Sequence, residues 1–231
     1  MTLQEALEIP RGLTALIGGG GKSTLLLRLG QALAAEGHTC ILCTTTHMHL
    51  PAGTPLCATA EEARALLSRN RLVTCGARGE AGKLCASAPM EALLPLADYV
   101  LCEADGSKRL PLKAHLPHEP VVPRETKRLL YLVGLDGIGA PIPQAAHRAE
   151  VYGRILGRDL AHRVTPADVV QVILQEGFGH ATLVLNKGEG PRQALGRQVA
   201  RLWPGRALIT SLLGPENTWE IWEYGEKCAE P

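Results

Sequence analysis

Apolar runs and helical patterns alternate along the chain. Residues 13–17 form a continuous apolar run that predicts a buried strand. The next stretch, 22–36, has leucines at 25, 26, 29 and 33, which is the stripe of a helix. Residues 39–44 form a second apolar run, as expected for a parallel strand that is covered on both faces. This order predicts an α/β fold.

The remaining pattern extends the same architecture to the end of the chain. Further core strands are expected at 99–102, 129–133, 182–185 and 207–210. Residues 207–210 are expected to form the final strand of the chain. Helices are expected at 2–9, 59–70, 89–96, from about 147, at 165–176 and at 192–202. Thr59 with Glu62, and Thr165 with Pro166, supply start signals for two of these helices. We therefore expect one domain, residues 1–231, built on a mostly parallel sheet flanked by helices.

Two short apolar runs interrupt this pattern. Residues 72–75 and 83–86 are separated by glycines, so they predict a β-hairpin appended to the sheet, in which Cys75 and Cys85 could face each other. Neutral packing is the favoured interpretation of these cysteines, with a working thiol pair as the alternative. Cys40 and Cys43 lie within one strand, where residues three apart point to opposite faces, so joint metal binding is not expected.

The stretch with the strongest chemical signal is the glycine loop, Gly18, Gly19, Gly20 and Gly21, followed by Lys22, Ser23 and Thr24. A strand, a glycine loop and a helix in this order are the context of a phosphate-binding P-loop. Glycines let backbone N–H groups approach an anion, and the helix N-terminus adds a positive dipole. Lys22 can reach the β- and γ-phosphates, and the Ser23 hydroxyl can ligate Mg²⁺.

The spacing of the loop departs from the standard form. A full Walker A motif needs a glycine at position 16, where the chain has Leu16, so the loop has the shorter form G-x-x-G-K-S. It resembles the short loop of Mur-type ligases and of some accessory ATPases. The alternative is a glycine-rich turn with a solvated lysine, but strand, loop, Lys-Ser and helix all coincide here.

Polar residues follow the strand at 39–44. The carboxyl ends of strands in a doubly wound sheet face the ligand crevice, so Thr44, Thr45, Thr46 and His47 are expected to face nucleotide or substrate. An ordinary strand-end turn is the alternative. His47 and His49 together suggest a metal site, but two histidines without a third ligand favour a polar crevice instead.

An acidic pair, Glu103 and Asp105, follows the strand at 99–102. A carboxylate at the end of an apolar strand is what a Walker B element places beside Mg²⁺, so Glu103 with Ser23 is the expected metal pair. We expect Glu103, Asp105 and Lys22 to take part in catalysis, although the general base could be Glu103, Asp105 or His47. Glu103-x-x-Gly106 also resembles an element of metallochaperone GTPases. An Asp-Gly turn is the structural alternative.

Asn186, Lys187 and Glu189 follow the strand at 182–185. Their order resembles the N-K-x-D element with which GTPases read guanine, except that Glu replaces Asp. The resemblance implies that all three residues contact the base, with weak discrimination between ATP and GTP. Thr210 and Ser211 lie where such GTPases have their last base-contact loop. A simple strand-end turn is the alternative.

Composition narrows the function further. The formal net charge is +1 and the chain has three Trp, four Tyr and one Phe, so neither nucleic acid nor a membrane surface is an expected partner. No apolar run approaches the roughly 20 residues of a membrane span. The beginning of the chain has no basic leader, and the seven scattered cysteines favour reduced thiols, so we expect a cytoplasmic protein.

Taken together, the chain resembles the YqeC-type family of selenium cofactor biosynthesis proteins, the selenium-dependent hydroxylase accessory family. The stretch 103–113, E-A-D-G-S-K-R-L-P-L-K, is the most specific part of this resemblance. It is also carried by Gly18–Ser23, Thr44–Met48, His118–Pro120, Gly134–Asp136, Gly139, His147–Arg148, Thr165–Pro166 and Asn186–Lys187. The resemblance implies a role in maturing selenium-dependent molybdenum hydroxylases, with selenium- or molybdenum-cofactor maturation proteins as partners. It supplies no reaction.

Three functions compete at this point. The first is a Mg²⁺-dependent hydrolase or switch for ATP or GTP that serves cofactor maturation. The second is a P-loop small-molecule kinase or an ATP-dependent ligase, whose acceptor would bind near Thr44–His47 and under residues 111–124, a proline-rich segment expected over the crevice. The third is a scaffold that holds nucleotide without hydrolysing it.

Overall fold

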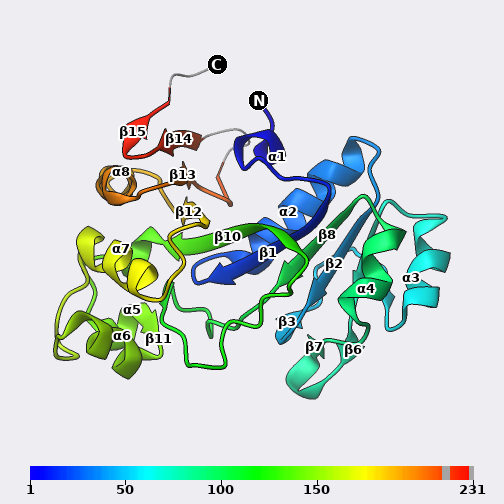
Figure 1. The fold of residues 1–231 in the computed structure, drawn as a ribbon, viewed down its shortest axis with the longest axis horizontal. Helices are drawn as coiled ribbons and strands as arrows, with labels where there is room; N and C mark the ends of the chain where they lie inside the picture. Colours follow the sequence, from blue (N-terminus) through cyan, green and yellow to red (C-terminus); the bar gives the residue numbers. More distant parts are fainter. Residues whose placement is uncertain (215–218, 229–231) are drawn as a thin grey trace.

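A large sheet forms the centre of the computed structural model, which describes residues 1–214 and 219–228. Its strands are β1 (Gly12–Gly18), β2 (Cys40–Thr44), β4 (Leu56–Cys57), β5 (Leu72–Cys75), β8 (Tyr99–Glu103), β10 (Thr126–Gly134), β12 (Thr182–Asn186), β13 (Arg206–Thr210), β14 (Trp219–Glu223) and β15 (Glu226–Lys227). They lie in the order β15-β14-β13-β12-β10-β1-β8-β2-β5-β4 (Figure 1). The strands from β13 to β4 pair in parallel, which confirms the predicted α/β class with a mostly parallel sheet.

Helices cover both faces of this sheet (Figure 1). They are α1 (Leu3–Ala6), α2 (Lys22–Ala35), α3 (Ala60–Leu67), α4 (Met90–Leu93), α5 (Ile142–Ala145), α6 (Ala149–Leu156), α7 (Pro166–Gln175) and α8 (Arg192–Leu202). Leu16 packs in the cluster under α1 and α2, whereas its neighbours Ala15 and Ile17 pack in the cluster on the other face. Burial on both faces explains why the strand sequences are continuously apolar. In the described ranges, none of the helices has the length and apolarity that a membrane crossing requires.

The antiparallel appendage differs from the predicted hairpin. Residues 72–75 join the central sheet as β5, and the appendage is a separate sheet in the order β3-β7-β6, with β3 (His47–His49), β6 (Ala77–Arg78) and β7 (Lys83–Cys85). The prediction that Cys75 faces Cys85 is therefore wrong. The sequence pattern could not separate these cases, because a buried parallel strand and half of a hairpin give the same short apolar run.

Four cysteines occupy one level of four adjacent strands. The register pairs Cys57 with Cys75 and Cys43 with Cys102, and β2 and β5 run in register between these pairs. All four side chains are at most 3% exposed and lie in the apolar cluster under α3 and α4. Cys40 belongs to the cluster on the opposite face, so the C-x-x-C sequence does not converge, as predicted.

The prediction that residues 207–210 form the last strand is also wrong. β14 and β15 follow β13 and extend its edge in antiparallel fashion. The sequence of β14, W-E-I-W-E, has glutamates between its apolar residues instead of forming an apolar run, and four of its five residues are only partly buried. A strand of this kind lacks the continuous apolar run by which the buried strands were recognised.

Parallel pairing brings the carboxyl ends of β1, β2, β8, β10 and β12 to the same edge of the sheet. The polar segments that follow these strands therefore lie near one another, as the doubly wound arrangement requires. A further parallel pair, β9 (Leu112–Lys113) with β11 (Ala146–His147), lies beside this region. The candidate site is built at this edge.

Candidate functional site

The glycine loop (Gly18–Gly21) turns sharply between β1 and α2. Gly20 has a φ of +79°, and a Cβ there would lie 2.3 Å from the backbone nitrogen of Gly134. Gly21 has a φ of +134°, and a Cβ there would lie 2.4 Å from Asn186 Nδ2. Only glycine fits these positions, because any side chain would meet both backbone strain and a close neighbour.

The first N–H groups of the loop point into the protein. Gly18 N–H donates to Asp105 Oδ2 at 2.8 Å, Gly19 N–H to the Leu132 carbonyl at 2.9 Å and Gly20 N–H to the Leu110 carbonyl at 3.1 Å. The start of α2 differs, since no side chain of the described residues caps it. The N–H groups of the first turn of α2 are therefore the ones that a bound anion could use.

Lys22 has a protein partner. Its Nζ donates to the Gly18 carbonyl at 2.5 Å and lies 3.0 Å from Asp105 Oδ1, and both charged side chains are almost fully buried. The sequence predicted that Lys22 would reach phosphate. In this conformation its charge is instead neutralised by Asp105.

Asp105 is the centre of a buried charge network. Besides Lys22, it lies 2.9 Å from His115 Nε2 and 3.4 Å from Lys113 Nζ. Burial opposes its ionisation, but the charges of Lys22 and Lys113 and the hydrogen bond with His115 outweigh burial and lower the pKa of Asp105 well below its ordinary value. His115 also pairs with Glu176 at 2.8 Å, and its two acidic partners raise its pKa against the effect of burial.

The network continues to Glu119. This carboxylate lies 2.9 Å from Arg148 and 3.6 Å from Lys113. Burial would raise its pKa, but the hydrogen bond from Arg148 and the charge of Lys113 lower it to about 2. Lys113 and His115 of the segment 111–124 are thus held in the buried network around Asp105, with the Lys113 side chain fully buried. The segment is absent from the lining of the cleft, so it does not lie over the crevice as the sequence suggested.

Ser23 and Glu103 form the pair expected to hold a metal. Ser23 Oγ donates to Glu103 Oε2 at 2.9 Å. Burial raises the pKa of Glu103, while the charge of Lys22 and the hydrogen bond from Ser23 act in the opposite direction. A hydroxyl and a carboxylate fit Mg²⁺, which takes few protein ligands and keeps waters and phosphate oxygens. Over the part of the chain that the structure describes, no group of three or more His, Cys, Asp or Glu side chains is arranged to hold a metal ion.

A cleft of about 900 Å³ opens above this pair. It brings together most of the residues that the sequence nominated. These are Gly20, Gly21, Lys22, Ser23, Thr24, His47, Glu103, Asn186, Lys187 and Glu189.

Other nominated residues lie outside the lining of this cleft. Gly18 and Gly19 form the inner part of the loop, where their N–H groups are bonded inside the protein, and Asp105 is 1% exposed beneath the loop. Thr45 turns away and donates to the Val121 carbonyl at 2.7 Å. Asp105 and Thr45 therefore support the walls of the site in this conformation.

Asn186 braces the glycine loop. Its Nδ2 donates to the Gly20 carbonyl at 2.7 Å, and its Oδ1 accepts from Leu212 N–H at 2.9 Å and from Lys187 N–H at 2.8 Å. The amide is thus committed to backbone groups. Lys187 pairs with Asp136 at 2.6 Å, and Glu189 pairs with Arg192 at 3.2 Å on the surface.

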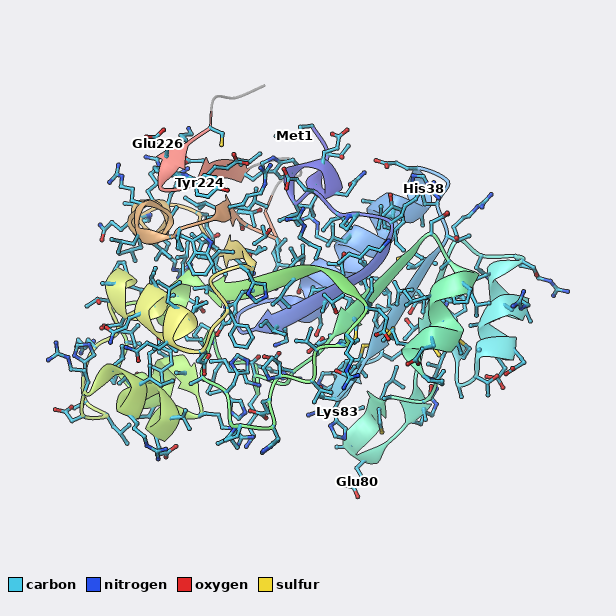
Figure 2. All side chains as sticks on the ribbon, viewed as in Figure 1. Met1, His38, Glu80, Lys83, Tyr224 and Glu226 are labelled. Atoms are coloured by element: carbon cyan, nitrogen blue, oxygen red, sulfur yellow. The ribbon has the colours of Figure 1, made fainter. Side chains whose placement is uncertain are left out.

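The cleft also contains further residues. His49, Gly106 and Ser211 belong to motifs that the sequence singled out, whereas Met48, Ala81, Lys83, Ser107 and Leu213 had no assigned role there. Lys108 and Arg109 complete the lining. Lys83 reaches the cleft because β7 pairs with β3, which sets Lys83 opposite His49. Figure 2 shows Lys83 on the inner side of the small sheet, with Glu80 at its outer tip. No sequence pattern indicated this pairing, whereas Lys108 and Arg109 share a stretch of seven residues with the two carboxylates, which already suggested charge chemistry.

Two comparisons with known proteins agree with each other. The sequence model of the family described as YqeC protein matches residues 14–150, which include the glycine loop and the stretch 103–113. The chain is also similar to a protein of Escherichia coli (strain K12) described as uncharacterized protein YqeC, with 30% identity over 169 residues. That match covers 69% of this chain and 66% of the relative, so the chain spans slightly less than two thirds of the relative's length.

Proposed function

Since this chain belongs to the YqeC family, we propose that it binds a magnesium-complexed nucleoside triphosphate in the cleft above the glycine loop and hydrolyses it. The nucleotide cycle would serve the maturation of selenium-dependent molybdenum hydroxylases, which is the role that the sequence resemblance implies. Client proteins would then be maturation factors for the selenium or molybdenum cofactor.

The observation that carries the proposal is the pairing of Ser23 with Glu103 at the start of α2. The hydroxyl and the carboxylate lie 2.9 Å apart, next to N–H groups that no side chain caps in the described structure. The helix dipole and these N–H groups favour an anion, and the two oxygens favour Mg²⁺. Ser23 and Glu103 would hold the ion, which when bound supplies charge stabilisation to the phosphates.

The order of the strands indicates how a nucleotide would be oriented in the cleft. Two strand spacings separate β12 from β1, about 10 Å at about 4.8 Å per spacing. The base would lie at the β12 and β13 end, between Lys187 and Leu213, and the phosphates would lie over β1 and α2. The Asn186 amide is hydrogen-bonded to the Gly20 carbonyl and the Leu212 N–H, so few of its donors and acceptors remain for a base. We therefore expect purine binding with weak discrimination between adenine and guanine.

A second candidate is phosphoryl transfer to a small acceptor. It is favoured by the extent of the cleft, which continues past Glu103 to His47 and Lys83 on the small sheet. Turnover that depends on an added acceptor would favour this candidate, whereas basal turnover in water favours the hydrolase. Tight binding without any turnover would favour a nucleotide-bound scaffold.

The test is a calorimetric titration of the purified chain with ATP and with GTP, with and without Mg²⁺, on wild type, Ser23→Ala and Glu103→Gln. We expect both variants to lose most of the Mg²⁺-dependent part of the affinity and the hydrolysis that goes with it. Glu91→Gln is the matched control, because Glu91 is exposed at the start of α4, outside the lining of the cleft. Nucleotide binding that is independent of Mg²⁺ and equal in all four proteins would contradict the proposal.

A further inference from the structure

Two consecutive residues at the rim of the cleft have left-handed backbones. Lys108 has a φ of +49° and Arg109 a φ of +64°. They are the central residues of a β-turn that is closed by Leu110 N–H, which donates to the Ser107 carbonyl at 2.9 Å. Positive φ at both central positions is the type I′ combination, in which Asn and Gly dominate because they tolerate it best. Lys and Arg, unlike Asn and Gly, are disfavoured at positive φ, so the backbone of this turn is strained.

The surroundings of this turn keep it in place. The Leu110 carbonyl accepts from Gly20 N–H at 3.1 Å, and the Pro111 carbonyl accepts from Gly134 N–H at 2.8 Å. On the other side, Lys113 Nζ donates to the Gly106 carbonyl at 2.7 Å. The turn is therefore attached directly to the glycine loop and to the buried charge network, and strain that neighbouring structure maintains is characteristic of functional sites.

The charges of the turn are available to a ligand. Both side chains are exposed and line the cleft, and neither forms an ion pair with another residue of the described ranges. The other cations around the glycine loop are less available to a ligand, because Lys22 is paired with Asp105 and Lys187 with Asp136. This part of the cleft has an excess of positive charge, because three cations, Lys108, Arg109 and Lys83, face one acid, Glu103.

We propose that the Lys108–Arg109 turn is the element that grips the terminal phosphates of the nucleotide, a task that the sequence motif alone would give to Lys22. The inference rests on the proposed function. A guanidinium beside an ammonium matches the oxygens of a polyphosphate, with the planar fork of Arg109 supplying paired donors. The attachment of Leu110 to Gly20 fixes the distance between these charges and the start of α2.

The test replaces Lys108 by Asn and Arg109 by Gly in one chain. Asn-Gly is the preferred sequence of a type I′ turn, so the variant removes both charges while it keeps the fold of the turn and relieves its strain. The probes are inorganic tripolyphosphate, ATP and ADP, each titrated by calorimetry with Mg²⁺, and the melting temperature is measured in parallel. Arg124→Asn is the control, because Arg124 is an exposed cation outside the lining of the cleft.

We expect the melting temperature of the double variant to be at least that of wild type, while its Kd for tripolyphosphate rises tenfold or more. Its preference for ATP over ADP should fall, since the lost charges face the terminal phosphate. Wild-type affinity for tripolyphosphate in the double variant would overturn the inference and leave the proposed function intact. Tripolyphosphate binding that depends on the turn, in a protein that binds no nucleotide, would contradict the proposed function and overturn the nucleotide as the ligand of the turn.

Discussion

The ammonium group of Lys22 lies 3.0 Å from Asp105 Oδ1, with both side chains almost completely removed from water. This contact neutralises the lysine of the glycine loop inside the protein. It also joins the loop to Lys113 and His115, which contact the other carboxylate oxygen. The residue that the sequence identifies as a phosphate ligand is therefore also part of the structural core.

The first prediction is that Lys22→Ala lowers the stability of the protein as well as its nucleotide affinity. Removal of one partner from a buried ion pair costs about 3–5 kcal/mol, and we expect the lower end of this range because Lys113 and His115 remain beside Asp105. Urea unfolding measures the stability, and calorimetry measures the affinity, whose loss we expect to be on the order of 1.5–3 kcal/mol. Lys127→Ala, at an exposed position, is the control. An unfolding free energy equal to that of wild type would show that the Lys22–Asp105 contact is not structural.

A second prediction concerns Asn186. Replacement by Ala leaves the Gly20 carbonyl and the Leu212 N–H without their side-chain partner. We expect a loss of about 2–3 kcal/mol in the free energy of unfolding, since buried polar groups lose their hydrogen bonds. Asn70→Ala is a matched control, because its amide donates to a single carbonyl, Leu66, at the end of α3. Equal losses in the two variants would mean that Asn186 does not brace the loop.

The third prediction is a loss of stability in acid that depends on Glu119. The pKa of this carboxyl falls from 4.5 to about 2 in the folded protein, because Arg148 and Lys113 outweigh burial. A depressed pKa stabilises the folded state fully above the unfolded value, and this contribution disappears as the pH falls from about 4.5 towards about 2. The lowered pKa of Asp105 adds to this effect, since its contribution to stability is also lost as the pH falls below its ordinary pKa of 3.8.

The measurement is urea unfolding of wild type, Glu119→Gln and the control Glu91→Gln between about pH 7 and about pH 3. Wild type should be more stable than Glu119→Gln near neutrality, and the difference should shrink as the pH falls. A difference that stays constant over this range would assign the stabilisation to something other than the charge of Glu119.

The fourth prediction is about the choice of base. Glu189 lines the cleft and pairs with Arg192 at 3.2 Å. Glu189→Asp gives the N-K-x-D order of the guanine readers, so we expect the preference for GTP over ATP to increase. A site built to hydrogen-bond a base rejects one that lacks the matching groups. The ratio of the two dissociation constants, measured in both proteins, is the readout. An unchanged ratio would show that Glu189 does not contact the base.

The sequence predicted the core of the fold because the core has the simplest pattern. Residues 13–17 are buried on both faces in β1, and an apolar run of this kind can be recognised without knowing its neighbours. The strands towards the edges of the sheet were harder to predict from the sequence. The apolar residues of β14 are interrupted by glutamates, so this strand was missed, and β5 is too short to be distinguished from half of a hairpin, so it was assigned incorrectly.

The candidate site divides in the same way. Ser23 and Glu103 could be paired from the sequence, because each directly follows a recognisable element and parallel strands end at one edge. His115 and Glu176 could not be placed beside Asp105, since they come from a proline-rich segment and the end of a distant helix. The strain at Lys108 and Arg109 is a property of backbone angles, which no residue pattern in that stretch indicated.

The row of buried cysteines gives the two halves of the sheet separate natural reporters. Cys57, Cys75, Cys43 and Cys102 lie on β4, β5, β2 and β8, while the buried Trp203 and Trp222 pack in the cluster at the β13 and β14 end. Once the partly buried Cys85 and Cys228 have been blocked, a thiol reagent labels these four cysteines only when their half of the sheet opens, whereas tryptophan fluorescence follows the other half. Agreement between the two signals during unfolding is a test of cooperativity that requires no engineered label. A lag of one behind the other would identify which half opens first.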